Sequence, residues 1–112
     1  MADPIARVWK GYGPAGGVKR YCDEHFFRVV LPQLRALDGF LGATLLVHDR
    51  GSESELVVIT QWVSISAIRQ FAGDVYERAV VEPAVRDLLD HFEDRVTHYT
   101  IALTAEANGG AA

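Results

Sequence analysis

Arg7 and Trp62 are the side chains whose positions most favour a chemical role. Arg7 lies inside a short, mostly apolar segment, residues 5–10, which we expect to form an interior strand. A cation fixed there could point into a cleft and hold an oxyanion, or it could pair with an acid across a dimer if the strand is an edge. Trp62 ends a later apolar segment and shares a predicted strand face with Thr60 and Val58. Its ring could be the flat wall of a pocket, or a core aromatic with a satisfied indole N–H.

Tyr76 and His98 are further candidates, in their case for proton transfer. Tyr76 could equally pack on a helix with its hydroxyl exposed. His98 shares a predicted strand face with Val96 and Thr100, and a lone histidine on a strand is more often a hydrogen-bonded core residue than a catalyst. The residues alone leave both the chemical and the structural interpretation open for each candidate.

The glycine-rich segment at residues 11–17 contains a match to the phosphate-binding pattern G-x-G-x-x-G. A dinucleotide site also needs a βαβ unit and an acidic residue about 20 positions later, at the end of the next strand. Asp38 stands at that distance but precedes the next predicted strand, and Asp49, which ends that strand, is too far away. We therefore interpret the segment as a turn that ends the first strand.

Metal and covalent chemistry are not expected. The four histidines lie on different predicted elements, no H-E-x-x-H motif is present, and the one cysteine, Cys22, lies within a predicted helix without an adjacent histidine. Metal sites need converging ligands, and a nucleophilic cysteine needs a base beside it. We expect no bound metal or cofactor, and we interpret Cys22 as a small core residue.

The composition is typical of one globular domain. The 112 residues are 49% hydrophobic and 23% charged, which excludes general disorder. A net charge of −4 and a pI near 5.5 argue against a nucleic-acid partner. A single cysteine fits a reducing compartment, no apolar run approaches the roughly 20 residues of a membrane span, and no secretory signal is visible. We therefore expect a soluble, cytoplasmic protein without a membrane partner.

The hydrophobic pattern predicts a single domain over residues 4–103 and a disordered tail at residues 104–112. The expected order of elements is the ferredoxin-like βαββαβ order of an α+β protein with an antiparallel sheet. The expected strands are residues 5–10, 40–48, 56–63 and 95–103, and the second and third form a hairpin. The expected helices are residues 18–38, kinked or broken near Leu31 by Pro32, residues 64–71, a restarted helix at 74–77, and a further helical segment at 83–89.

Both faces of this sheet should be covered, because neither hairpin strand alternates cleanly between apolar and polar residues. The helices cover one face. Residues such as Val57, Ile59 and Ile101 make the other face apolar, and no part of the chain is left to cover it. We therefore expect a homodimer packed sheet to sheet.

Several short motifs, spread over nearly all of residues 4–102, match those of a known family. They are Ile5-Ala-Arg-Val-Trp9, Leu37-Asp-Gly-Phe-Leu-Gly42, Thr60-Gln-Trp-Val-Ser64 with Ala67-Ile68 and Phe71-Ala-Gly73, Val80-Val-Glu-Pro83, and His98-Tyr99. At these residues the chain resembles the antibiotic biosynthesis monooxygenase domain family of the dimeric α+β barrel superfamily. The resemblance implies a ferredoxin-like protomer, an obligate homodimer whose sheets form a barrel, and one pocket per protomer between sheet and helices.

Only one functional residue of that family is carried over intact. The tryptophan that these enzymes have at the end of the third strand falls on Trp62. Val58 stands where the polyketide-oxidising members have asparagine. Arg7 and about Val80 stand where the haem-degrading members have asparagine and an iron-binding histidine. Valine cannot ligate iron, so the resemblance does not favour haem degradation here.

The resemblance implies oxidation of an electron-rich aromatic ligand, such as a phenol, anthrone or hydroquinone, without a cofactor. The deprotonated substrate must then supply the electrons to O2, while the protein supplies a dry pocket, a base and charge stabilisation. In this hypothesis Trp62 is the stacking wall, Arg7 stabilises the oxyanion, and His98 or Tyr76 moves the proton. Two alternatives stay open: a cyclase or isomerase that only transfers protons, and a small-ligand-binding protein without turnover.

Overall fold

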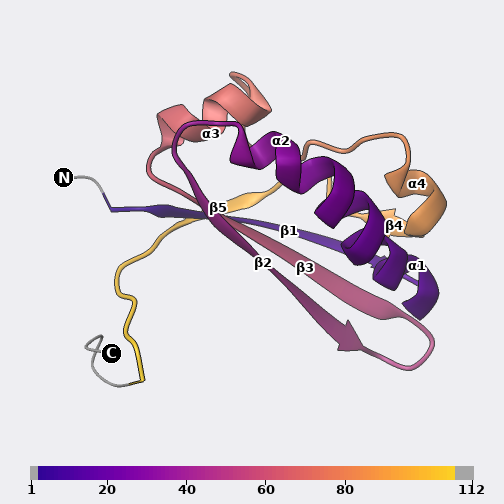
Figure 1. Cartoon of the computed structure of the whole chain (residues 1–112). Helices are drawn as coiled ribbons and strands as arrows, with labels where there is room; N and C mark the ends of the chain where they lie inside the picture. Colours follow the sequence, from indigo (N-terminus) through magenta and orange to yellow (C-terminus); the bar gives the residue numbers. More distant parts are fainter. Residues whose placement is uncertain (1–2, 108–112) are drawn as a thin grey trace.

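The computed structural model describes residues 3–107 and is built on a five-stranded antiparallel sheet (Figure 1). β1 (Ile5–Gly13) lies inside the sheet, between β3 (Ser54–Trp62) on one side and the short strands β4 (His91–Phe92) and β5 (Thr97–Thr100) on the other. β2 (Phe40–Asp49) forms the edge beside β3. This order confirms the predicted ferredoxin-like arrangement of an α+β protein.

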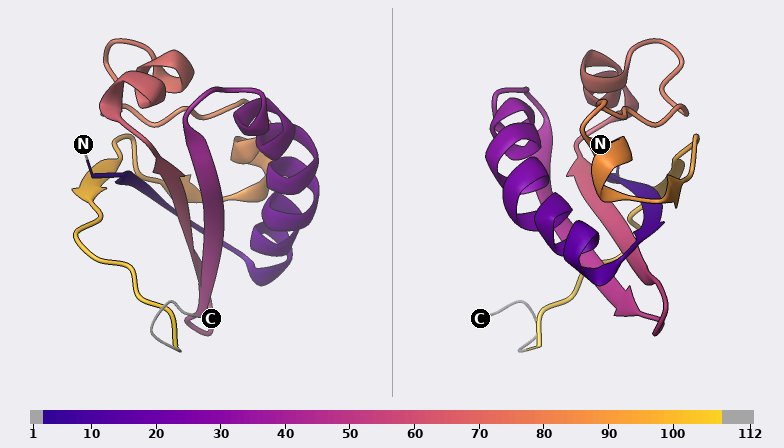
Figure 2. Two further views of the ribbon diagram at one scale, coloured as in Figure 1. Left: turned by 60° about the vertical axis from the view of Figure 1, so that its left-hand side comes forward. Right: turned by 90° about the vertical axis from the view of Figure 1, so that its right-hand side faces the viewer.

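The helices cover one face of this sheet (Figure 2). α1 (Ala15–Arg20), the π-helix η1 (Tyr21–Val30) and α2 (Leu31–Arg35) follow one another without interruption and run along the sheet as one rod. α3 (Ile65–Ala72) lies near the α2 end of this rod, and α4 (Val85–Leu88) lies near its α1 end (Figure 1). The chain is thus a two-layer structure, with its core between the rod and the sheet.

Strand alternation decides which side chains face the helical layer. Arg7 of β1 pairs with Thr60 of β3, and Trp9 pairs with Val58, and all four are buried. Because successive side chains of a strand point to opposite faces, the residues between them face away from the helices. The site-bearing residues of β1 and β3 therefore share one interior surface.

The opposite face of the sheet is apolar and open in this chain. Val57 and Ile59 of β3 lie on it and are half-buried. Leu46 of β2 is 49% exposed and Tyr99 of β5 is 55% exposed. The predicted second apolar face is therefore present, and it consists of large aliphatic and aromatic side chains.

The long helix continues through Pro32, and its winding changes at Leu31, where the prediction placed a kink or break. Over η1 the backbone is wound more widely, so that an N–H bonds to the carbonyl five residues earlier, as that of Leu31 does to Phe26. Pro32 has no N–H to donate and stands in the first turn of α2, where the winding changes from π to α. Pro32 is therefore accommodated at the point where the hydrogen-bond pattern of the helix changes.

β1 is longer than predicted, because Gly11 and Gly13 continue the strand. A Cβ at Gly11 would lie 2.6 Å from Leu89 Cδ1, and one at Gly13 would lie 3.1 Å from Leu89 Cα. The two glycines let the chain at Leu89 pack directly on the strand backbone. The interpretation of residues 11–17 as a turn is wrong, since α1 begins at Ala15, two residues after the strand ends.

Residues 73–84 form an irregular segment, so the predicted helix at residues 74–77 is wrong. The carbonyls of Tyr76 and Arg78 accept hydrogen bonds from the Arg7 side chain. The carbonyl of Glu77 accepts from the N–H of Val96. These distant partners satisfy the backbone groups that a helix would have paired locally.

The C-terminal part also differs from the prediction. The helical segment is only α4, because Leu89 is already extended. The last strand is only β5, and β4 precedes it as a separate pairing with β1 that the sequence pattern did not predict. Residues 104–107 contain no helix or strand and are exposed. The rest of the predicted disordered tail, residues 108–112, lies outside the described residues.

Candidate functional site

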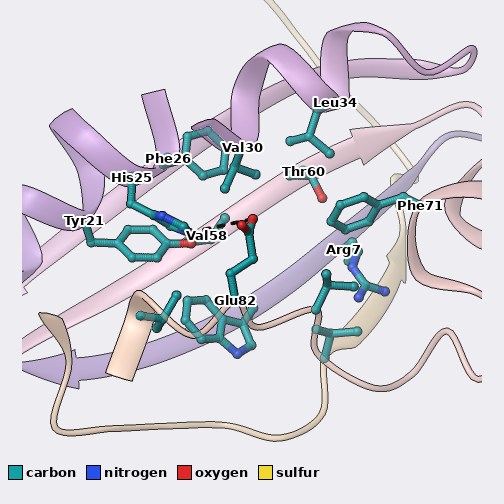
Figure 3. A pocket seen from close by; sticks show the side chains of 14 residues that line it. Arg7, Tyr21, His25, Phe26, Val30, Leu34, Val58, Thr60, Phe71 and Glu82 are labelled. Atoms are coloured by element: carbon teal, nitrogen blue, oxygen red, sulfur yellow. Dashed lines mark ion pairs between the residues drawn. The ribbon is translucent and has the colours of Figure 1, made fainter. Parts of the chain in front are cut away.

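A cavity of about 60 Å³ lies between the sheet and the helical layer. Its walls come from β1, β3, η1, α2, α3, α4, the segment before α4 and the segment between β4 and β5 (Figure 3). The apolar part of its lining is Trp9, Phe26, Val30, Leu34, Val58, Phe71, Val80, Val85 and Val96, and the polar part is Arg7, Tyr21, His25, Thr60 and Glu82. A mostly apolar cavity with a few converging polar groups is the usual character of a small-molecule site.

The winding of η1 determines which of its side chains reach the cavity. Tyr21, His25, Phe26 and Val30 all line it, whereas Val29 is 40% exposed. In an α-helix residues three and four apart share a face. The wider π-turn instead brings residues four and five apart together, and π-turns are frequent at functional sites.

The polar groups lie toward two ends of the cavity. In Figure 3, Arg7 and Phe71 lie on the right, Tyr21 and His25 lie on the left, and Glu82 extends between them. A ligand in the cavity would therefore meet a cation at one end and a histidine, a phenol and a carboxylate toward the other.

Arg7 is a buried cation without an acidic partner among residues 3–107. Only 5% of its surface is exposed, and none of the ion pairs in the described part of the chain includes it. Its guanidinium donates to the backbone carbonyls of Tyr76 at 2.6 Å and Arg78 at 3.0 Å. Burial lowers the pKa of Arg7 to about 10, which reflects the cost of a charge in apolar surroundings.

This placement decides between the two interpretations of Arg7. The pairing of Arg7 with an acid across a dimer is wrong for this fold, because β1 is an interior strand and Arg7 points to the helical face. An anionic ligand in the cavity would offset the burial of the charge. The geometry therefore favours the oxyanion-holding role.

His98 stands beside Arg7 in the pairing of β1 with β5. Its Nε2 is 3.1 Å from Nη1 of Arg7. Because a guanidinium can only donate, Nε2 is the acceptor, and the neutral ring carries its proton on Nδ1. Burial, helped by the positive charge of Arg7, lowers the pKa of His98. His98 is not part of the cavity lining, so the geometry favours a role in positioning Arg7 over proton transfer to a ligand.

Trp62 supports the cavity from behind. It is fully buried, and its indole Nε1–H donates to Oγ1 of Thr60 at 2.9 Å. Its ring stacks on Phe71, with centroids 5.8 Å apart and planes at 25°. Phe71 and Thr60 line the cavity while Trp62 does not. Trp62 therefore matches the alternative of a core aromatic with a satisfied indole N–H, and Phe71 is the aromatic ring that lines the cavity beside it.

Tyr76 contributes its backbone to the site. Its carbonyl accepts from Arg7, while its ring packs against His98 at 5.4 Å and under the guanidinium of Arg69 at 5.2 Å. Its phenol is not part of the cavity lining. The structure thus brings Tyr76 and His98 together around Arg7 but outside the cavity.

Three polar residues of the cavity were not singled out from the sequence. Nε2 of His25 is 3.9 Å from Oε1 of Glu82, and the rings of Tyr21 and His25 are 5.4 Å apart. Burial raises the pKa of the Tyr21 phenol. Tyr21 and His25 lie one helical turn apart on the helix face that also carries buried Val18, and this spacing is the one signal that could have identified them.

Neither a metal-binding cluster nor a membrane-spanning helix is found among residues 3–107. No group of three or more histidine, cysteine, aspartate or glutamate side chains in residues 3–107 is arranged to hold a metal ion. None of the helices formed by these residues has the length and apolar character that crossing a bilayer requires. The cytoplasmic location stays a prediction.

Comparison with known proteins gives structural matches only. No protein-family model matches the chain, and no curated protein matches its sequence. Among solved structures, a candidate antibiotic biosynthesis monooxygenase from Bacillus cereus has a TM-score of 0.65 at 15% identity, covering 95% of this chain and 100% of that one. A haem-degrading protein from Mycobacterium tuberculosis has a TM-score of 0.63 at 20% identity, with coverage of 96% and 100%. A Streptomyces coelicolor monooxygenase in complex with the ligand nanaomycin D has a TM-score of 0.64 at 20% identity, with coverage of 94% and 92%.

These matches confirm the fold that the sequence motifs implied. A dimeric ferredoxin-like protein is also among the similar structures. At identities this low the similarity concerns the fold, and the matched proteins do not share one activity. The function of this chain must therefore be inferred from the residues that line its cavity.

The cavity does not fit the haem-degrading role at the position that the resemblance indicates. Val80 lines the cavity there, and its side chain has no atom that can bind iron.

Proposed function

We propose that the protein oxidises a small electron-rich aromatic compound, such as a phenol, anthrone or hydroquinone, with O2 and without a bound cofactor. The observation that carries this proposal is the buried cation Arg7, which has no acidic partner among residues 3–107 and lies at the end of an apolar, aromatic-lined cavity. Such a site suits a ligand that is flat and apolar but carries a negative oxygen. The deprotonated form of these compounds has this character.

The reaction balances without another redox partner. For an anthrone, the methylene group and O2 give a carbonyl group and one water, so the substrate supplies all the electrons that reduce O2. Loss of a proton makes the substrate electron-rich enough to react, and Arg7 stabilises the resulting oxyanion. Phe71, held from behind by Trp62, stacks on the ring.

The cavity must enlarge to admit such a ligand. Its volume of about 60 Å³ is less than half of the roughly 150 Å³ that accommodates benzene in an engineered cavity. The irregular segment at residues 73–84 carries Val80 and Glu82 into the cavity. It has no helix or strand of its own, so we infer that this segment moves outward when the ligand enters.

The proposal includes a homodimer. The open face of the sheet exposes Leu46 and Tyr99 and includes Val57 and Ile59. Contiguous apolar faces of this kind are usually covered by a partner. A second copy packed sheet to sheet would cover it, as the resemblance implies, and a dimeric protein of similar fold supports this arrangement.

A second candidate function is a cyclase or isomerase reaction that only transfers protons. The specific observation in its favour is His25 beside Glu82 in the cavity wall, because a histidine oriented by a carboxylate is a common proton-transfer pair. O2 dependence separates the two functions. Ligand binding without any product would instead identify a small-ligand-binding protein.

The test is oxygen uptake by the metal-stripped protein with anthrone, 1-naphthol and hydroquinone. We expect uptake above the uncatalysed rate for at least one compound. Arg7→Gln should lower it about 100-fold, and Arg28→Gln, which removes an exposed arginine from η1, should not. Equal rates with and without protein for all three compounds would contradict the oxygenase proposal. Equal rates for Arg7→Gln and the wild type would contradict the role of Arg7.

A further inference from the structure

His25 separates the cavity from the outside of the molecule. Its ring lines the interior cavity and also a groove on the surface between η1 and α4. Only 7% of the residue is exposed. The groove side carries the charged residues Arg20, Glu24 and Asp87. His25 is thus a titratable side chain with access to both sides of the wall.

Glu82 gives this histidine an acidic neighbour inside the cavity. Its Oε1 is 3.9 Å from Nε2 of His25, and its side chain is 39% exposed. Tyr21 lies beside the pair, with its ring 5.4 Å from that of His25. Burial raises the pKa of the Tyr21 phenol, so it stays protonated and can donate a hydrogen bond but does not serve as a base. His25 and Glu82 are the two bases at this end of the cavity, and His25 is the one that also lines the groove.

We propose that His25, oriented by Glu82, removes a proton from the ligand in the cavity and releases it to the groove between η1 and α4. The proposal rests on the proposed function in one respect, namely that the oxyanion of the ligand lies at Arg7. The ligand's activated C–H bond breaks, its electron pair is delocalised onto the oxygen at Arg7, and an N–H bond forms on His25. The proton then passes to Glu82 or to water in the groove, and no electrons are transferred to or from the protein.

The charges of the cavity favour this step. Before it, Arg7 has no anionic partner among residues 3–107, and the carboxylate of Glu82 lies beside the imidazole of His25. After it, Arg7 faces an oxyanion and Glu82 faces an imidazolium. One proton transfer therefore pairs both charges, at opposite ends of the ligand.

The arrangement also selects a kind of ligand. Arg7 and His25 lie toward opposite ends of the cavity (Figure 3). The acidic proton must therefore leave from one end of the ligand while the negative charge collects on an oxygen at the other end. Anthrone has this geometry, because its acidic methylene group and its carbonyl oxygen lie on opposite sides of the central ring. We infer that compounds with the two groups across a ring are preferred to isomers with the two groups adjacent.

Proton removal can be measured without oxidation. Under anaerobic conditions in D2O, the methylene protons of anthrone exchange for deuterium at a rate that NMR follows directly. We expect the wild-type protein to accelerate this exchange and His25→Asn to lose about 100-fold of the acceleration. Glu82→Gln should lose less. His91→Asn is the matched control, because His91 also lies beside a glutamate, Glu53, but on the surface, and its rate should equal that of the wild type.

A rescue experiment separates catalysis from structure. His25→Ala opens the wall at the groove, and added imidazole should restore exchange to this variant but not to Glu82→Gln. If His25→Asn, folded as judged by its thermal transition, exchanges anthrone as fast as the wild type, the proposal is wrong. The absence of any acceleration by the wild type would overturn it as well.

Oxygen uptake on the same variants keeps this inference distinct from the oxygenase proposal. Exchange that depends on His25, without oxygen uptake, would support the proton-transfer site and contradict the oxygenase. Uptake that is equal in the wild type and His25→Asn would support the oxygenase and contradict the proton-transfer site.

Discussion

Replacement of Arg7 by glutamine should change the ionisation of a phenol bound in the cavity. The guanidinium has more N–H groups than the three contacts that engage it, which go to two backbone carbonyls and to His98. A phenolate oxygen can therefore accept from Arg7 without displacing every partner. Glutamine keeps an N–H donor but removes the charge.

The size of the effect follows from the contact. A hydrogen bond to a charged group contributes about 1.5–3 kcal/mol, and each pKa unit corresponds to about 1.4 kcal/mol. The pKa of the bound phenol should thus lie about 1–2 units lower in the wild type than in Arg7→Gln. The affinity for the phenolate should fall about 10–100-fold in the variant. Binding of an uncharged analogue of the same shape should hardly change.

The ligand 4-nitrophenol makes this visible, because its phenolate absorbs visible light and its neutral form does not. A pH titration of the bound ligand, with saturation confirmed by quenching of Trp9, which lines the cavity, gives the two pKa values. Arg28→Gln is the control for the loss of one positive charge at an exposed site. Equal pKa values of the bound phenol in the wild type and Arg7→Gln would show that Arg7 does not contact the oxyanion.

Three further predictions concern His98, Trp62 and Val57. The folded-state pKa of His98 is lowered below about 6.5, so the unfolded chain binds the proton more readily and stability falls as the pH drops through this range. His98→Gln should make the urea midpoint of unfolding less dependent on pH between about pH 5 and pH 7. The same pH dependence in the variant and the wild type would contradict this. Trp62→Ala should lower the free energy of unfolding by about 3–5 kcal/mol, because the ring is fully buried and bonded to Thr60; a loss below about 1 kcal/mol would place it outside the core. Val57→Lys puts a charge on the open sheet face, and light scattering should then find a monomer where the wild type is a dimer; a dimer in both would exclude sheet-to-sheet packing.

The sheet could be predicted from the sequence because its strands depend on local patterns. The hairpin of β2 and β3 follows from two apolar runs separated by a polar turn with glycine. Gly11 and Gly13 misled the prediction, because glycine is typical of turns. Their actual role is to make room for Leu89, nearly 80 positions away, and no local pattern contains that contact.

The helical segments show a second limit. From Val18 and Cys22 onward, an α-helical period allows either His25 or Phe26 to face inward, and likewise either Val29 or Val30. The π-winding of η1 resolves the ambiguity by burying both His25 and Phe26. The winding depends on packing against the sheet, which a periodicity of 3.6 residues cannot represent.

The candidate site was predicted in part. Arg7 was identifiable because a charge inside an apolar strand needs an explanation. For Trp62 the sequence left a pocket wall and a core aromatic open, and the buried ring with its indole N–H bonded to Thr60 matches the core aromatic. His25 and Glu82 were missed, because they are 57 positions apart and meet only when the irregular segment folds over η1.

The π-helix makes the chemistry of the cavity sensitive to chain length. Each residue of an α-helix turns the chain by about 100°, and each residue of the wider π-helix turns it by less. The loss of one residue such as Arg28, with a return of η1 to ordinary winding, would therefore change which side chains between Tyr21 and Val30 face the cavity. A one-residue deletion on the outer surface could thus exchange the polar end of the cavity for a different set of side chains and leave the sheet and its hydrogen bonds intact. Helix length, rather than substitution inside the cavity, is then a direct route by which this fold can acquire a new ligand.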